Sequence, residues 1–300
     1  MKKVTNQHLI GIIFVLLAAL GFSLMTFFVK LSGDLPTMQK VFFRNAVAAV
    51  IASVTLFRSK EKFQVQKGSW GYLFLRSIMG TLGMIANFWA IDRLALPDSN
   101  ILNKMSPFFA IIMSYFILKE KPNRVEWISV ILAFVGAVFV VKPTQGIASL
   151  PAVVGLFGGF AAGFAYTCVR KLGKMGERGP MIVFFFSAFS TLISAPFLIF
   201  GYQHMTWLQL LYLILSGVSA ALGQFSITAA YTHAPAKEIS VFDYTQVIFA
   251  AILGGIFFSE RPDMYSIIGY VIIIGVAVFR WYYNLHQDNK KKPEKVEKKP

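Results

Sequence analysis

Apolar residues along this chain collect into long runs that short polar and charged stretches separate. A helix rises about 1.5 Å per residue, so about 20 residues cross a hydrocarbon layer of about 30 Å. Backbone groups in lipid need partners within their own segment, which makes helices the expected solution. The pattern predicts an all-α integral membrane protein with ten transmembrane helices. The expected spans are 8–29, 37–57, 70–91, 97–118, 125–141, 152–170, 181–200, 208–230, 238–258 and 264–283.

An internal repeat at an offset of 140 residues relates the fourth run to the ninth. The stretch 94–123 reads LALPDSNILNKMSPFFAIIMSYFILKEKPN, and the stretch 234–263 reads APAKEISVFDYTQVIFAAILGGIFFSERPD. Each copy has a polar lead-in, an apolar run and a charged stop, and the offset places Glu120 on Glu260. Both glutamates stand at span ends, so we expect them to end and cap helices. A repeat of this kind indicates a fold built from two copies of one unit.

The repeat divides the chain into two halves, 1–145 and 146–285, with five expected spans in each. Because five is odd, the halves cross the membrane in opposite senses, which predicts two inverted five-helix repeats. Inverted repeats are typical of secondary transporters, in which the halves alternately close the two sides of a central site. The stretch 286–300 reads HQDNKKKPEKVEKKP, and its charged, low-complexity composition predicts a disordered basic tail.

At this point the chain resembles the EamA-type transporters of the drug/metabolite transporter superfamily. The resemblance implies a central cavity lined by spans 1, 3, 4, 6, 8 and 9, counted in chain order, with spans 5 and 10 at the periphery. It also implies a small-molecule substrate and, in some members, a homodimer supported by spans 5 and 10. It extends over about residues 8–283 and rests on Phe43-Arg44, the Glu-x-Pro stops in 118–122 and 258–262, Gly136 and Gly275.

The distribution of Lys and Arg predicts the orientation. With the N-terminus inside, fifteen of these residues fall in inner segments and five in outer segments, without the lysines of the tail. This asymmetry satisfies the positive-inside rule and places both termini in the cytoplasm, with membrane lipid around the spans. The formal net charge of +15 thus reflects topology in the cytoplasmic membrane, and we expect no nucleic-acid partner.

The remaining composition restricts the chemistry. The chain is 56% hydrophobic and 14% charged, whereas soluble domains carry about 25% charged residues. A single Cys168 and four scattered His residues provide no disulfide and no metal-ligand spacing. The chain also lacks a Gly-x-Ser-x-Gly elbow, a Walker loop, a His-Glu-x-x-His pair and a Rossmann fingerprint. We therefore expect neither an enzyme nor a cofactor, and no ATP-driven step.

Charged side chains within the expected spans are costly to bury, so each is a functional candidate. Arg44, Arg76 and Lys104 carry positive charge, and Asp243 is the only carboxylate placed well inside a span. For the arginines, a cavity role competes with structural pairing of Arg44 and with snorkelling of Arg76 to the headgroups. Asp243 is the candidate for proton coupling.

Two polar triplets correspond through the repeat, and helical spacing places each triplet on one face. We expect both to face a shared cavity, where Lys104 supplies charge to an anionic group of the substrate. The alternative is a Lys104–Asp243 ion pair that only fixes helix packing. Asn87, on the same helical stripe as Arg76, and Tyr166 are further cavity candidates. The triplets are Asn100, Asn103 and Lys104 in the first half and Ser240, Asp243 and Tyr244 in the second.

These observations predict a secondary active transporter that moves a small polar metabolite across the membrane by alternating access. The three cations within spans exceed the one carboxylate by two, which favours a substrate with a carboxylate or phosphate, such as an amino acid. The alternatives are a membrane channel, a lipid- or drug-translocating protein without metabolite specificity, and a membrane enzyme.

The charge asymmetry generates a test of topology. The test uses Lys62→Cys, Arg124→Cys and Lys174→Cys, each in a Cys168→Ser background. Because the positive-inside rule places these loops in the cytoplasm, we expect no reaction with a membrane-impermeant thiol reagent in intact cells. The introduced cysteines should react once the membrane is opened. Labelling of Lys62→Cys from outside intact cells would refute the orientation.

Overall fold

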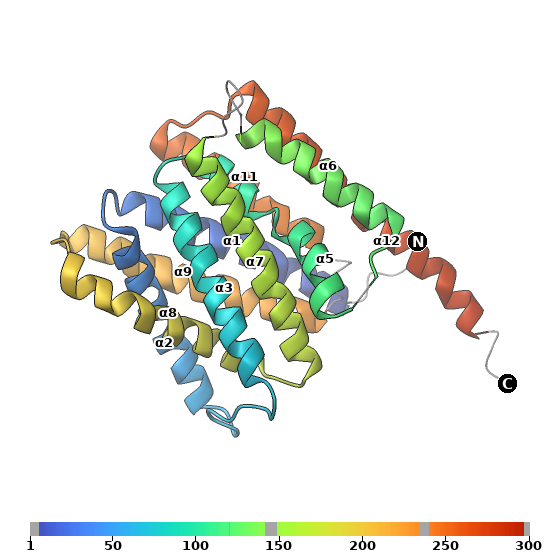
Figure 1. Ribbon diagram of the computed structural model, residues 1–300, viewed down its shortest axis with the longest axis horizontal. Coiled ribbons are helices and arrows are strands. Elements are labelled where there is room, and N and C mark those ends of the chain that lie inside the picture. Colours follow the sequence, from blue (N-terminus) through green and yellow to red (C-terminus); the bar gives the residue numbers. More distant parts are fainter. Residues whose placement is uncertain (1–5, 120, 142–148, 234–239, 297–300) are drawn as a thin grey trace.

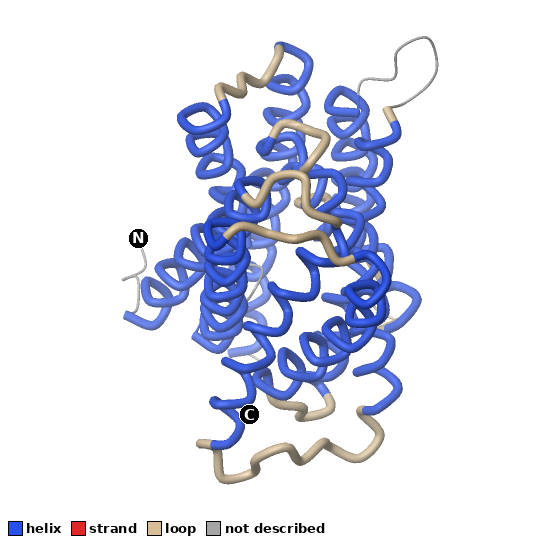
Figure 2. Tube along the Cα trace, turned by 90° about the vertical axis from the view of Figure 1, so that its left-hand side faces the viewer, coloured by secondary structure: helices blue, strands red, loops and turns tan. Residues whose placement is uncertain are grey.

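The computed structural model describes residues 6–119, 121–141, 149–233 and 240–296 (Figure 1). Within these ranges the chain forms helices and connecting loops but no strand (Figure 2), which confirms the predicted all-α class. The helices are α1 (Asn6–Leu31), α2 (Thr37–Phe57), α3 (Trp70–Ile91), α4 (Leu96–Asn103), α5 (Ser106–Ile117), α6 (Arg124–Val141), α7 (Leu150–Lys174), α8 (Gly179–Gly201), α9 (Trp207–His233), the 3-10 helix η1 (Ser240–Tyr244), α11 (Thr245–Phe258) and α12 (Met264–Val296).

Eight helices of the described chain are long and apolar enough to cross a membrane: α1, α2, α3, α6, α7, α8, α9 and α12. They correspond to eight of the ten predicted spans. Large apolar side chains remain exposed on their outer faces, for example Ile131 on α6 and Val271 on α12. Such faces are suited to lipid, and the chain is a multi-pass membrane protein.

The other two predicted spans are not continuous helices. Span 97–118 is interrupted at Lys104, between α4 and α5, and Pro107 lies in the first turn of α5. Proline has no N–H, and its ring collides with the carbonyl four residues earlier, so an unbroken helix here is disfavoured. In span 238–258, the 3-10 helix η1 ends at Tyr244, where α11 begins. The prediction of ten full-length transmembrane helices is therefore not confirmed.

The last helix is longer than the predicted span. α12 continues past residue 283 to Val296 and projects from the bundle (Figure 1). The stretch from residue 286, which we expected to be disordered, is thus helical up to Val296.

The helices pack in pairs that join the two predicted halves. To exchange the halves means to replace α1, α2, α3, α4 and α6 by α7, α8, α9, α11 and α12, and the reverse. This exchange converts the pair α1–α9 into the pair α3–α7. It leaves the other three pairs, which are given below, unchanged. The main helix pairs are thus the same after the two predicted halves are exchanged. The pairs are α1 with α9, α2 with α8, α3 with α7, α4 with α11, and α6 with α12.

Small residues allow the paired helices to approach closely. A Cβ atom added to Gly21 of α1 would lie 2.8 Å from the Gly223 nitrogen of α9. At the α6–α12 contact, which lies at the edge of the bundle in Figure 1, a Cβ added to Gly269 would lie 2.7 Å from the Gly136 oxygen. Gly275, which carried part of the family resemblance, has nothing within 4 Å of such a Cβ. The packing glycine of α12 is therefore Gly269.

An ion pair joins the beginning of α4 to both halves. The Lys30 ammonium, near the end of α1, pairs with Glu260 and donates to the Leu94 carbonyl at 2.7 Å. The second Glu260 oxygen accepts a hydrogen bond from the Leu96 N–H at 2.7 Å. Glu260 thus caps α4 rather than its own helix, and Glu120, its partner in the repeat, lies outside the described residues.

A second ion pair lies within the first half of the chain. The Lys40 ammonium of α2, which is fully buried, lies 2.6 Å from the Asp92 carboxylate after α3. Burial raises the pKa of the Asp92 carboxyl above its ordinary value, and the neighbouring Lys40 opposes this shift. The pair therefore ties two helices of the first half together.

The packing of α7 generates a stability test. A Cβ added to Gly163 would lie 2.5 Å from the Ser106 oxygen and 2.7 Å from the Phe109 Cβ. Overpacking of this kind costs about 1–3 kcal/mol, so Gly163→Ala should lower the melting temperature of the detergent-solubilised protein.

Gly173→Ala in the same helix is the matched control, because nothing lies within 4 Å of its Cβ position. Alanine is favoured over glycine in a helix by about 1 kcal/mol, so this control should be neutral or slightly stabilising. Equal melting temperatures for the two variants would contradict the close contact of α7 with α5.

Candidate functional site

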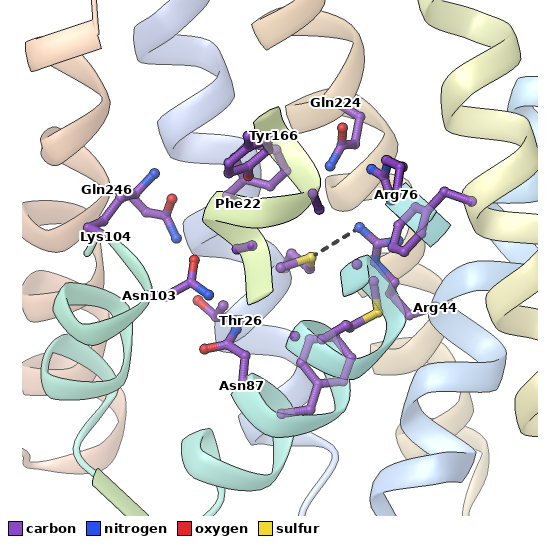
Figure 3. A pocket seen from close by; sticks show the side chains of 18 residues that line it. Phe22, Thr26, Arg44, Arg76, Asn87, Asn103, Lys104, Tyr166, Gln224 and Gln246 are labelled. Carbon is purple, nitrogen blue, oxygen red and sulfur yellow. Dashed lines mark hydrogen bonds between the residues drawn. The ribbon is translucent and has the colours of Figure 1, made fainter. Parts of the chain in front are cut away.

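A cavity of about 100 Å³ lies where helices of both halves meet (Figure 3). Lining residues come from α1, α3, the end of α4, α7, α9 and α11, which correspond to the six spans that the family resemblance implies. α2 and α8 each add one side chain, Arg44 and Phe186. Both halves therefore build the site.

The structure brings most of the predicted site residues together. Asn100, Asp243 and Tyr244 do not line the cavity but contact residues that do. The side chain of Ser240 lies outside the described part of the chain. The six predicted residues that line the cavity are Arg44, Arg76, Asn87, Asn103, Lys104 and Tyr166.

The two helix breaks meet at an ion pair. Lys104 follows the last residue of α4, and its Nζ lies 2.5 Å from Asp243 Oδ2 in η1. The hydroxyl of Tyr244 donates to the Lys104 carbonyl at 3.2 Å, a carbonyl at the end of a helix. Asp243 Oδ1 is buried without a hydrogen-bond partner in the structure. The contact that we weighed as the alternative to a cavity role is thus present, although Lys104 also lines the cavity.

Amide side chains continue the contact between α4 and α11 beyond the two helix breaks. Gln246 Nε2 of α11 donates to Asn100 Oδ1 of α4 at 2.5 Å, and Asn100 Nδ2 donates to the Leu96 carbonyl at 2.8 Å. The Ser23 hydroxyl of α1 donates to the Gln246 carbonyl at 3.3 Å. These hydrogen bonds join α1, α4 and α11, and Asn100 lies behind the cavity wall.

The two arginines have a different environment. Arg76 and Arg44 are 4% and 2% exposed, and neither forms an ion pair with a carboxylate among the described residues. Arg76 Nε and Nη1 and Arg44 Nε are buried without a hydrogen-bond partner. Arg44 Nη1 donates to Asn45 Oδ1 at 2.7 Å, and its Nη2 lies 3.6 Å from Met25 Sδ. The cavity wall therefore carries two guanidinium groups with unused donors.

Phe186 of α8 holds this part of the wall, and sequence analysis did not identify it. The centroid of its ring lies 3.7 Å from the Arg76 guanidinium carbon and 5.9 Å from that of Arg44. A Cβ added to Gly80 would lie 2.6 Å from Arg76 Nη1 and 2.9 Å from the Phe186 ring. Gly80 thus leaves the space in which the guanidinium stacks on the ring, a favourable arrangement for a cation.

The polar groups of the cavity separate into two sides. Figure 3 shows Arg44 and Arg76 on one side and Lys104, Asn103 and Gln246 on the other. One side thus presents guanidinium groups, and the other presents amides beside an ion pair. Over the described ranges, no group of three or more His, Cys, Asp or Glu side chains is arranged to hold a metal ion.

A multi-pass helical fold with a polar cavity between its helices is typical of membrane transporters. Sequence comparison gives the family. The chain belongs to the EamA-like transporter family, whose profile matches residues 9–142 and 149–281. The two matches fall on the two halves that the repeat predicts.

Individual relatives extend over most of the chain. The pseudopaline exporter CntI of Pseudomonas aeruginosa is 34% identical over 272 residues, covering 89% of this chain and 94% of the relative. The riboflavin transporter of Vibrio cholerae is 24% identical and covers 92% and 94%, and human solute carrier family 35 member G1 is 25% identical and covers 91% and 80%. One solved crystal structure shares the fold, with a TM-score of 0.63 at 13% identity over 89% of this chain and 94% of that chain.

The ion pair at the helix breaks generates a double-variant test. Lys104→Met or Asp243→Leu alone leaves a buried charge without its partner, which costs about 3–5 kcal/mol, so each should lower the melting temperature. The double variant should recover much of this loss, because the contact is pairwise. A double variant as unstable as the sum of the single ones would contradict a direct pair, and full transport by it would exclude a substrate-binding role for this pair.

Proposed function

We propose that the chain is a ten-span secondary transporter that moves a small polar metabolite across the cytoplasmic membrane by alternating access. In this proposal the halves 1–145 and 146–285 are inverted repeats, and the broken helices α4–α5 and η1–α11 each serve as one span. The exchange-symmetric helix pairing and the two breaks near the same repeat position support this arrangement. Broken helices at the centre of inverted repeats commonly form the substrate sites of transporters.

The observation that carries the substrate proposal is the pair of buried arginines without an acidic partner. Burying a charge without compensation costs several kcal/mol, and an arginine cannot escape this cost by losing its proton. Guanidinium groups bind carboxylates and phosphates through charge-assisted hydrogen bonds. We assign Arg44 and Arg76 to an anionic group of the substrate, and Asn87, Asn103 and Tyr166 to its remaining polar groups.

The ion pair is assigned a different role. Lys104 has Asp243 as its partner, so its charge is already balanced in this conformation. We propose that the pair joins the two broken helices and that Asp243, with one buried oxygen unpartnered, remains the candidate for proton coupling. The names of the relatives support transport of small organic molecules, and one of them is named as an exporter.

The proposal predicts ligand binding that depends on the arginines. We expect small carboxylates or phosphates to raise the melting temperature of the purified protein, because a ligand at 100 times its Kd adds about 2.7 kcal/mol to stability. Arg44→Gln and Arg76→Gln should each need a higher ligand concentration for this shift and should lower the associated transport in proteoliposomes. Without ligand, both variants should be at least as stable as the wild type, because each removes an unpaired buried charge.

Arg93→Gln is the matched control, since Arg93 is exposed and lies outside the cavity. This control should keep the ligand-induced shift. Stabilisation of the wild type by neutral or cationic metabolites, and by no anion, would contradict the proposal.

A further inference from the structure

We infer that the ligand places two negative charges on Arg44 and Arg76, either as two carboxylates or as one phosphate monoester. This inference rests on the proposed function and narrows its substrate class from anions in general to dianions. It begins from a contrast among the buried cations. The lysines have acidic partners, Lys40 with Asp92 and Lys104 with Asp243, whereas the two arginines have none among the described residues.

The two arginines belong to one subsite. Both guanidinium groups line the same cavity, and their carbons lie 3.7 and 5.9 Å from the centroid of the Phe186 ring, so we place them in one subsite. Two like charges at one cavity repel each other in a low-dielectric interior. The protein nevertheless holds them together, on the same side of the cavity (Figure 3).

Charge balance then decides between a monoanion and a dianion. Lys104 and Asp243 cancel, so the charged side chains at the cavity carry a net charge of +2. A single carboxylate would compensate only one of these two positive charges. A dianion neutralises both groups and also removes their mutual repulsion. The far side presents Asn103 and Gln246, so the rest of the ligand can be polar and neutral.

The unused donors agree with this count. Arg76 Nε and Nη1 and Arg44 Nε are three donor atoms without partners, and they belong to two separate guanidinium groups, each of which can bind one carboxylate. Two carboxylates or the three terminal oxygens of a phosphate monoester offer enough acceptors. The buried Phe186 ring stacks on the face of the Arg76 guanidinium and fixes the orientation of the group at the cavity.

Matched probes test the inference on the purified full-length protein in detergent, at constant ionic strength and mildly alkaline pH. Succinate, its monoamide succinamate and its diamide succinamide have similar size and differ in charge by one step each. Methyl phosphate and dimethyl phosphate form a second dianion and monoanion pair. The measurement is the probe concentration that produces half of the maximal rise in melting temperature.

We expect at least one dianion to reach half-saturation at a concentration about tenfold lower than its matched monoanion, and the neutral diamide to produce no shift. Preference in the succinate series identifies a dicarboxylate, and preference in the phosphate series identifies a phosphate monoester. Arg44→Gln and Arg76→Gln should each abolish the difference within the preferred pair. Arg93→Gln should preserve it.

Equal half-saturation by dianions and monoanions in the wild type would overturn this inference and leave the proposed anion site intact. If no anion stabilised the wild type, the proposed function would fail together with the inference. Arg76→Lys provides a second variant if a glutamine variant does not fold. It keeps the charge, so it should retain part of the dianion preference although it lacks the planar fork.

Discussion

The ion pair between Lys104 and Asp243 is the contact on which the centre of this structure depends. It lies where two helices are interrupted, and an interrupted helix leaves backbone groups that lipid cannot satisfy. The Tyr244 hydroxyl reaches the Lys104 carbonyl, so the second break satisfies an acceptor of the first. Residues 104 and 244 are related by the repeat offset of 140, and the first break is thus completed by its counterpart.

The buried charged side chains fall into two groups, lysines with acidic partners and arginines without them. Lysines with acidic partners hold helices together, and removing either partner would leave a costly buried charge. Arg44 and Arg76 form no ion pair among the described residues, and burial of an uncompensated charge is unfavourable. A folded protein retains such groups when function needs them, because functional sites often trade stability for activity.

Sequence reasoning located the long helices because lipid imposes a minimum apolar length on each span. It also offered the Lys104–Asp243 pair as the alternative to a cavity role, because the repeat offset compares depth and face without any structure. It did not predict the break at Lys104, since proline is tolerated within membrane helices when neighbours satisfy the backbone. Nor could it select Phe186, one of 30 phenylalanines, because contact with Arg76 depends on how α8 packs against α3.

The positions of the ion pairs constrain any motion of the halves. Lys30–Glu260 and Lys104–Asp243 each join a lysine of the first half to an acid of the second, and together they fix α4 at both ends. Lys40–Asp92 lies within the first half and can move with it. Alternating access requires the halves to move against each other. In the proposed cycle, α4 therefore either follows the second half, to which its two ends are bound, or exchanges at least one of these two ion pairs for water or ligand.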